Sequence, residues 1–184
     1  MNVVVLLSSR LALFVSLLAN VASLTIPLNV PVSAFVRSAT VVMPADTATG
    51  QVRIVKLVAS GDAGRAINPV MLKGQEDGAA IMGLGQSLFE HMVYDAQGRL
   101  RNADPLTYRV PLAEDLPHDF VTITQEQGHG PGPFGAKGAG EGTILPIASA
   151  IANAIHDAVG VRITCLPITP VRVLEALTHQ ESAP

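Results

Sequence analysis

The alternation of apolar and polar positions becomes regular near residue 36 and first predicts a β-hairpin. The segment "FVRSATVVM" at residues 35–43 is rich in β-branched side chains, and "QVRIVKLVA" at residues 51–59 alternates as a strand does. Between them, "PADTATG" supplies Asp, Thr and Gly residues that favour turns. Residues 36–59 are therefore expected to form two strands joined by this turn.

Two long helical patterns follow the hairpin. The first begins after Asn68, a good N-cap residue, and Pro69 suits the first helical position because its missing N–H costs nothing there. The second runs from Thr143 to about Ala158 and is apolar nearly all round, which predicts that it is buried. Gly160 is expected to end it as a C-cap.

Four glycines interrupt the first helical pattern, at Gly74, Gly78, Gly83 and Gly85. Each costs up to about 1 kcal/mol relative to Ala in a helix interior, so their presence needs a cause. Close packing of this helix against a sheet or another helix is one explanation, and a bulky ligand lying on its face is the other. The periodicity of the segment leaves both open.

The remaining segments complete a mixed α and β pattern. Residues 119–127, "DFVTITQEQ", are predicted to be a strand, and residues 161–169, "VRITCLPIT", a last strand with Cys165 buried in it. A short helix is predicted at residues 170–177. The expected fold is therefore α/β (α+β), with both long helices packed on a mixed sheet.

The first 30 residues differ from the rest, because Arg10 is their only charged residue. The apolar run at residues 11–24 is too short and too interrupted to predict a membrane span, but it is typical of an export signal, and "VAS" at residues 21–23 suits cleavage. A buried first element or a mis-started gene would explain the same pattern. We expect the segment to pack poorly on the domain and the protein to be cytoplasmic, with export as the alternative.

Composition and length narrow the class of protein. The 184 residues carry a formal net charge of −3 with no basic stripe, which argues against nucleic acid as a partner. The single cysteine, Cys165, excludes an internal disulfide and a cysteine-based metal site. We divide the chain into an apolar segment at 1–32, one domain at 33–178 and a tail at 179–184.

The glycine-rich segment "GHGPGPFGAKGAGEG" at residues 128–142 invites comparison with phosphate-binding loops. A P-loop requires a lysine directly after its second glycine and then Ser or Thr, but Ala136 separates Gly135 from Lys137 and no hydroxyl residue follows. A dinucleotide fingerprint needs an acidic residue about 20 positions further on, and Asp157 lies inside the next helix instead. Both nucleotide interpretations are therefore weak.

Glu141 lies where this loop meets the second long helix, so free backbone N–H groups and the positive end of the helix face one place. A first-turn glutamate stabilises a helix by a few tenths to about 1 kcal/mol through the helix dipole. Alternatively, the carboxylate lies in a partly dry apolar pocket. Burial would raise its pKa and the helix end would lower it, and the balance could poise the group as a general base.

Three ordered segments together resemble one family. "DAGRAINPVMLKGQEDGAAIMGLGQSLFE" is similar to a D-x-G-x-x-x-N-P segment followed by G-Q-x-x-G and G-x-G-Q, and "GPFGAKGAGEG" is similar to a G-x-K-G-x-G-E loop. "AIANAIHDAVGVRITCLPITPVRVLEAL" is similar to a closing helix followed by L-P-[IL]-T-P. Over about residues 36–177 the chain resembles the C-terminal part of the molybdopterin-binding subunit of the xanthine dehydrogenase and aldehyde oxidase family, the molybdenum hydroxylases.

This resemblance implies a fold like the second molybdopterin-binding domain of that family, and a molybdenum–molybdopterin cofactor, either molybdopterin itself or its cytosine dinucleotide. It implies that Glu141 is the catalytic base beside the metal and that Gln75 bonds the pterin through its amide. The other residues that it places at the cofactor are Gly74, Lys137, Gly138 and Gly140. No side chain of this chain is implied as a metal ligand.

The resemblance also implies partners, because the family's subunit is several times longer than this chain. A complementary N-terminal molybdopterin-binding half, an iron–sulfur subunit and an FAD subunit would complete the enzyme, and the substrate would be an aldehyde or an N-heterocycle. The chain is then a C-terminal fragment or a split subunit that is inactive alone. A truncated remnant or scaffold module without cofactor, and an exported or membrane-tethered binding module on the same scaffold, are the alternatives.

Overall fold

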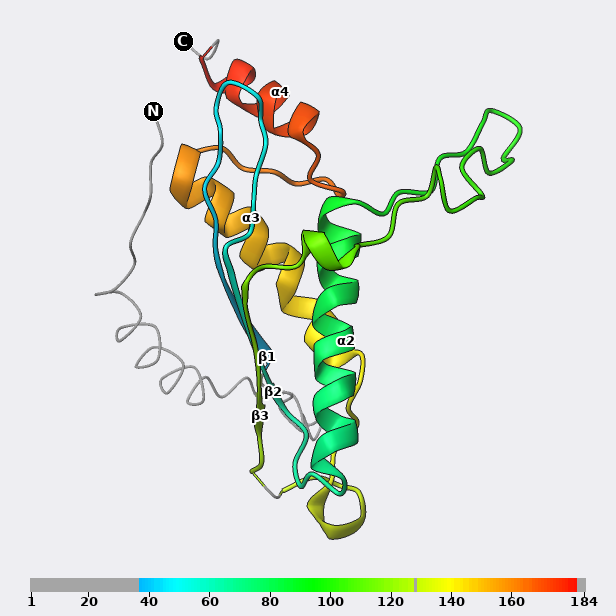
Figure 1. Ribbon diagram of the computed structural model, residues 1–184, viewed down its shortest axis with the longest axis vertical. Helices are drawn as coiled ribbons and strands as arrows, with labels where there is room; N and C mark the ends of the chain where they lie inside the picture. Colours follow the sequence, from blue (N-terminus) through cyan, green and yellow to red (C-terminus); the bar gives the residue numbers. More distant parts are fainter. Residues whose placement is uncertain (1–36, 128, 182–184) are drawn as a thin grey trace, which may run out of the picture.

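The computed structural model describes residues 37–127 and 129–181, whose arrangement Figure 1 shows. The predictions for the apolar segment at residues 1–32 therefore lie outside the described residues. None of the helices in the described part of the chain has the length and hydropathy that a membrane span requires.

A three-stranded sheet forms one layer of the domain, with the strand order β1-β2-β3. β1 (Arg37–Val42) pairs antiparallel with β2 (Lys56–Asp62), and β2 pairs parallel with β3 (Asp119–Gln125). The predicted hairpin and the predicted strand at residues 119–127 are both present. Because one pairing is antiparallel and the other parallel, the predicted mixed sheet is confirmed.

Two helices cover one face of this sheet (Figure 1). α2 (Pro69–Leu88) begins as predicted, with the Asn68 side-chain oxygen accepting a hydrogen bond from the N–H of Met71 at 3.1 Å. α3 (Leu145–Val159) ends at Gly160, whose φ of 79° is the left-handed conformation of a glycine C-cap. The core joins both helices to β1 and β2 through Val41, Leu57, Ala59, Ala80, Leu84, Ile147, Ile151 and Ile155.

Shorter helices complete the chain. The 3₁₀ helix η1 (Ala113–Asp115) precedes β3, whereas η2 (Pro133–Gly135) and η3 (Gly142–Ile144) lie between β3 and α3. α4 (Pro170–Glu181) begins at the predicted proline and continues to Glu181. The tail that the sequence analysis separated at residue 179 therefore starts within this helix.

Two expectations from the apolar patterns are wrong. Only one face of α3 is fully buried, that of Ile147, Ile151 and Ile155 at four-residue spacing, whereas its alanines are half-buried. Residues 161–169 form no strand, because no described strand pairs with them; the N–H of Ile168 instead donates to the carbonyl of Ser87 in α2 at 2.7 Å. Cys165 is consequently exposed rather than buried in a strand.

The four glycines of α2 divide into two pairs. A Cβ added at Gly83 would lie 2.8 Å from Cγ1 of Ile147, and one added at Gly85 would lie 2.8 Å from Cδ of Pro111. Close packing therefore explains these two. An added Cβ at Gly74 or Gly78 would meet nothing within 4 Å, so the first half of α2 presents an open glycine face.

This division predicts opposite effects of one substitution at two positions in the same helix. Gly83→Ala is expected to lower the free energy of unfolding by about 1–3 kcal/mol, because the new methyl group overpacks the contact with Ile147. Gly78→Ala is the matched control and is expected to raise it by up to about 1 kcal/mol, through helix propensity alone. Urea denaturation of both variants measures the difference. Equal effects at the two positions would contradict the packing described here.

Candidate functional site

The glycine-rich loop is anchored along the segment that joins β2 to α2. The N–H of Lys137 donates to the carbonyl of Ala63 at 2.8 Å, and the N–H of Arg65 donates to the carbonyl of Gly135 at 3.1 Å. An antiparallel bridge between Gly64 and Ala136 lies between these two bonds. The two motif-bearing segments are therefore neighbours, and the loop is held through its backbone.

A buried ion pair reinforces this anchor. The ammonium of Lys137 bonds a carboxylate oxygen of Asp62, and the two side chains are 7% and 2% exposed. Burial alone would raise the pKa of Asp62, but the hydrogen bond and charge of Lys137, together with the N–H of Gly64 at 2.8 Å, lower it below its ordinary value. Lys137 thus holds the loop in place, with its charge directed at Asp62.

A second buried contact ties α2 to the start of α3. The hydroxyl of Thr143 donates to the carboxylate of Glu76, and both residues are 1% exposed. Beside this contact the loop approaches α2 closely, because a Cβ added at Gly140 would lie 3.3 Å from the side-chain oxygen of Gln75. Gly140 has a φ of 119°, which other residues rarely adopt. The structure therefore brings Gln75 and Gly140 close together.

Glu141 is exposed at the entrance to η3 and makes no side-chain capping hydrogen bond. Three residues separate it from the first residue of α3, so it remains near the positive end of that helix. The dry pocket that the sequence analysis considered for this carboxylate is not formed by the described residues. The Glu141 side chain also does not cap η3.

The surface between α2 and the loop has room and polar groups for a pterin cofactor. Gly74, Gly78 and Gly138 leave room, since a Cβ added at any of them would meet nothing within 4 Å. The exposed amide of Gln75 offers both a donor and an acceptor there. No group of three His, Cys, Asp or Glu side chains capable of holding a metal exists among residues 37–127 and 129–181. The residues present fit a pterin that brings its own metal.

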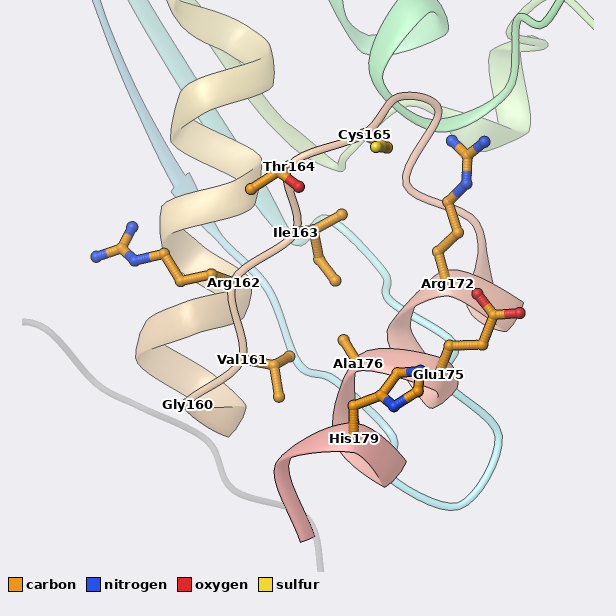
Figure 2. Close-up of a pocket in the computed structure, with 10 residues that line it drawn as sticks. All are labelled: Gly160, Val161, Arg162, Ile163, Thr164, Cys165, Arg172, Glu175, Ala176 and His179. Atoms are coloured by element: carbon orange, nitrogen blue, oxygen red, sulfur yellow. The ribbon is translucent and has the colours of Figure 1, made fainter. Parts of the chain in front are cut away.

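A separate hollow of about 610 Å³ lies between residues 160–165 and α4, as Figure 2 shows. Cys165, Arg172 and His179 are among its lining residues. None of the lining residues belongs to the two glycine-rich segments. The volume of this hollow therefore says nothing about the candidate site, which is an open surface.

Sequence reasoning missed the two buried pairs, Asp62 with Lys137 and Glu76 with Thr143. The sequence could have suggested the first pair. Lys137 is the only Lys or Arg of its glycine-rich loop, and Asp62 is the only acidic residue of the segment at 56–75. The two residues of the second pair are 67 positions apart in the sequence, and no sequence motif links them. Only the fold brings them together.

The sequence of this chain is similar to those of known proteins. The family described as the molybdopterin cofactor-binding domain matches residues 31–117. The xanthine dehydrogenase molybdenum-binding subunit of Escherichia coli O157:H7 is 40% identical over 134 residues, 71% of this chain and 17% of that subunit. The 6-hydroxypseudooxynicotine dehydrogenase complex subunit gamma of Paenarthrobacter nicotinovorans is 38% identical over 130 residues, 70% of this chain and 16% of that subunit.

A solved structure of similar fold is the aldehyde oxidoreductase from Desulfovibrio gigas, with a TM-score of 0.66 and 32% sequence identity. The match covers 75% of this chain and 15% of that one. The fold is therefore that of a molybdopterin-binding domain. The chain belongs to the molybdenum hydroxylase family, that of xanthine dehydrogenase and aldehyde oxidase, and it spans only a small part of the curated relatives it matches.

Proposed function

We propose that this chain is one part of the molybdenum-binding subunit of a molybdenum hydroxylase that oxidises an aldehyde or an N-heterocycle. The observation that carries the proposal is the close approach of Gln75 and Gly140 beside an open glycine face of α2. When bound, the molybdenum cofactor would supply the Lewis-acid and two-electron redox chemistry of the hydroxylation. The iron–sulfur and FAD centres would reside on partner subunits.

Gln75 and the backbone of the loop would hold the pterin. A side-chain amide pairs with a heterocycle edge that offers one donor and one acceptor, because it carries both groups itself. Gly74, Gly138 and Gly140 would let the cofactor approach the backbone closely. Lys137 would act indirectly, since its ion pair with Asp62 holds the loop in position.

Glu141 would be the general base of the reaction. Its carboxylate is exposed in this chain, at the end of the loop that passes Gln75. A complementary polypeptide that covers this surface would exclude water from Glu141 and would hold the substrate beside the carboxylate, which could then accept its proton. This requirement explains why the chain alone should be inactive.

Gln75→Ala is expected to lower the pterin and molybdenum content of the completed complex at least about 10-fold, because a buried heterocycle edge loses its hydrogen-bond partner. The chain would be copurified with a polypeptide that supplies the complementary N-terminal molybdopterin-binding half, and molybdenum and pterin would be measured per mole of complex. Gln51→Ala, at an exposed position in the turn after β1, is the matched control. Unchanged cofactor content in the Gln75 variant would refute the assignment of this site.

A further inference from the structure

A carboxylate is buried where α2 meets the turn that leads into α3. Glu76 and Thr143 are each 1% exposed, and the Thr143 hydroxyl donates to the Glu76 carboxylate. Taking a carboxylate out of water is costly, whereas an apolar side chain could fill the same space without that cost. The carboxylate at position 76 therefore needs a cause other than the stability of the fold.

The two partners of this contact are sequence neighbours of the candidate site residues. Gln75, which is exposed, directly precedes Glu76 in α2. Thr143 lies in η3, directly after the segment that contains Gly140 and Glu141. One buried contact therefore joins the turn of α2 that carries Gln75 to the turn that follows Glu141.

Two anchors enclose the glycine-rich stretch at residues 138–142. At one end, Lys137 bonds the segment that joins β2 to α2, and at the other end, Thr143 bonds α2. The two side chains of the stretch, those of Ala139 and Glu141, are exposed and so contribute little to holding it. The position of the stretch therefore depends on its two anchors.

The backbone of Glu141 belongs to the turn that Thr143 anchors. The N–H of Ile144 donates to the carbonyl of Glu141 at 3.1 Å. The same turn packs on α2 at a second point, because a Cβ added at Gly83 would lie 3.1 Å from the carbonyl oxygen of Ile144. The contact between α2 and this turn thus has a polar half at Thr143 and a closely packed half at Gly83.

We propose that Glu76 is a positioning residue that acts through the Thr143 hydroxyl to fix the place of Glu141. The inference rests on the proposed function, in which Glu141 accepts the proton and Gln75 binds the pterin. Because Gln75 and Glu76 are neighbours in α2, the contact fixes the base relative to the residue that holds the cofactor. A general base must reach its proton at hydrogen-bond distance, and a displacement of about 1 Å can lower a rate about 10²-fold.

The test is amide hydrogen exchange, measured by NMR on the full chain alone, which requires neither the cofactor nor a partner. Thr143→Val keeps the shape of the side chain and removes the hydroxyl, so the Ile144 amide is expected to exchange at least about 10-fold faster. The amides of Lys137 and Gly160 donate to carbonyls outside this contact and should change by less than about 2-fold. Thr143→Ser keeps the hydroxyl and should exchange as the unchanged chain does.

Variants of Glu76 test the same contact from its other side. Glu76→Met removes the acceptor and should act like Thr143→Val, whereas Glu76→Gln keeps an acceptor oxygen and should act like the unchanged chain. Ser87→Ala is the matched control, because Ser87 is a fully buried hydroxyl of α2 that donates to the carbonyl of Gly83 instead. This control should leave the ratio of the Ile144 and Gly160 exchange rates unchanged.

Each outcome decides the question. Faster exchange confined to Ile144 in Thr143→Val and Glu76→Met, with rescue in the two conservative variants, supports the positioning role. Equal acceleration at Ile144, Lys137 and Gly160, or no acceleration at Ile144, overturns that role and leaves the proposed function standing. Absence of molybdenum and pterin from the complex with a complementary N-terminal half overturns the proposed function, and with it the positioning of a catalytic base.

Discussion

Replacement of Glu141 by Gln is expected to lower turnover per bound molybdenum by at least about 10²-fold in the completed complex. Glutamine keeps the size of the side chain and a hydrogen-bonding oxygen, but it cannot accept a proton. The cost to folding should be about 1 kcal/mol or less, since Glu141 is exposed and makes no capping hydrogen bond. Cofactor content should therefore stay near that of the unchanged complex.

The measurement is turnover divided by molybdenum content, which separates the chemical role of Glu141 from cofactor loss. Glu175→Gln is the matched control, because Glu175 is an exposed glutamate on α4 outside the loop. Turnover per metal close to that of the unchanged complex in the Glu141 variant would show that the base assignment is wrong. The glutamate would then serve only the electrostatics of the helix start.

Lys137→Met is expected to lower the free energy of unfolding by about 3–5 kcal/mol, because it leaves the charge of Asp62 buried without its partner. Lys56→Met is the matched control. Lys56 pairs with Asp119 at 2.6 Å, but the two side chains are 44% and 49% exposed, so its loss should cost about 0–1 kcal/mol. Chemical denaturation at neutral pH compares the two variants, and equal losses would contradict a structural role for the buried pair.

The pH dependence of stability follows from the same pair. The pKa of Asp62 is lower in the folded chain than its ordinary value, so the folded state favours the charged carboxylate. Its contribution is fully present above the unfolded pKa of about 3.9 and is lost as the pH falls through the folded value. Denaturation between neutral pH and about pH 3 should therefore show a loss of stability that is smaller in an Asp62→Asn, Lys137→Met double variant.

Short-range sequence signals correctly predicted one end of each long helix. Asn68 and Pro69 fixed the start of α2, and Gly160 fixed the end of α3, because caps depend on a few adjacent residues. The strand predicted at residues 161–169 failed, since β-branched side chains favour an extended backbone but a strand also needs a partner. Pairing is a property of the whole fold and is absent from a local pattern.

The sequence motifs predicted which residues make up the candidate site, but they did not predict the contacts that hold these residues in place. Motif resemblance predicted that Gln75 and Gly140 contact the same cofactor. The structure brings the two residues close together, and the contact with the cofactor stays a prediction. The pairs that fix the loop, Asp62 with Lys137 and Glu76 with Thr143, join positions 75 and 67 residues apart. No rule of sequence spacing links residues so far apart, so these contacts could not be predicted without the three-dimensional structure.

The most direct test of the account is the molybdenum and pterin content of the full chain, purified alone and together with a polypeptide that supplies the complementary N-terminal molybdopterin-binding half. The account predicts stoichiometric molybdenum and pterin in the complex and little of either in the chain alone, because one side of the cofactor's enclosure is missing there. Stoichiometric cofactor and turnover in the chain alone, or a stable complex that contains neither molybdenum nor pterin, would contradict it.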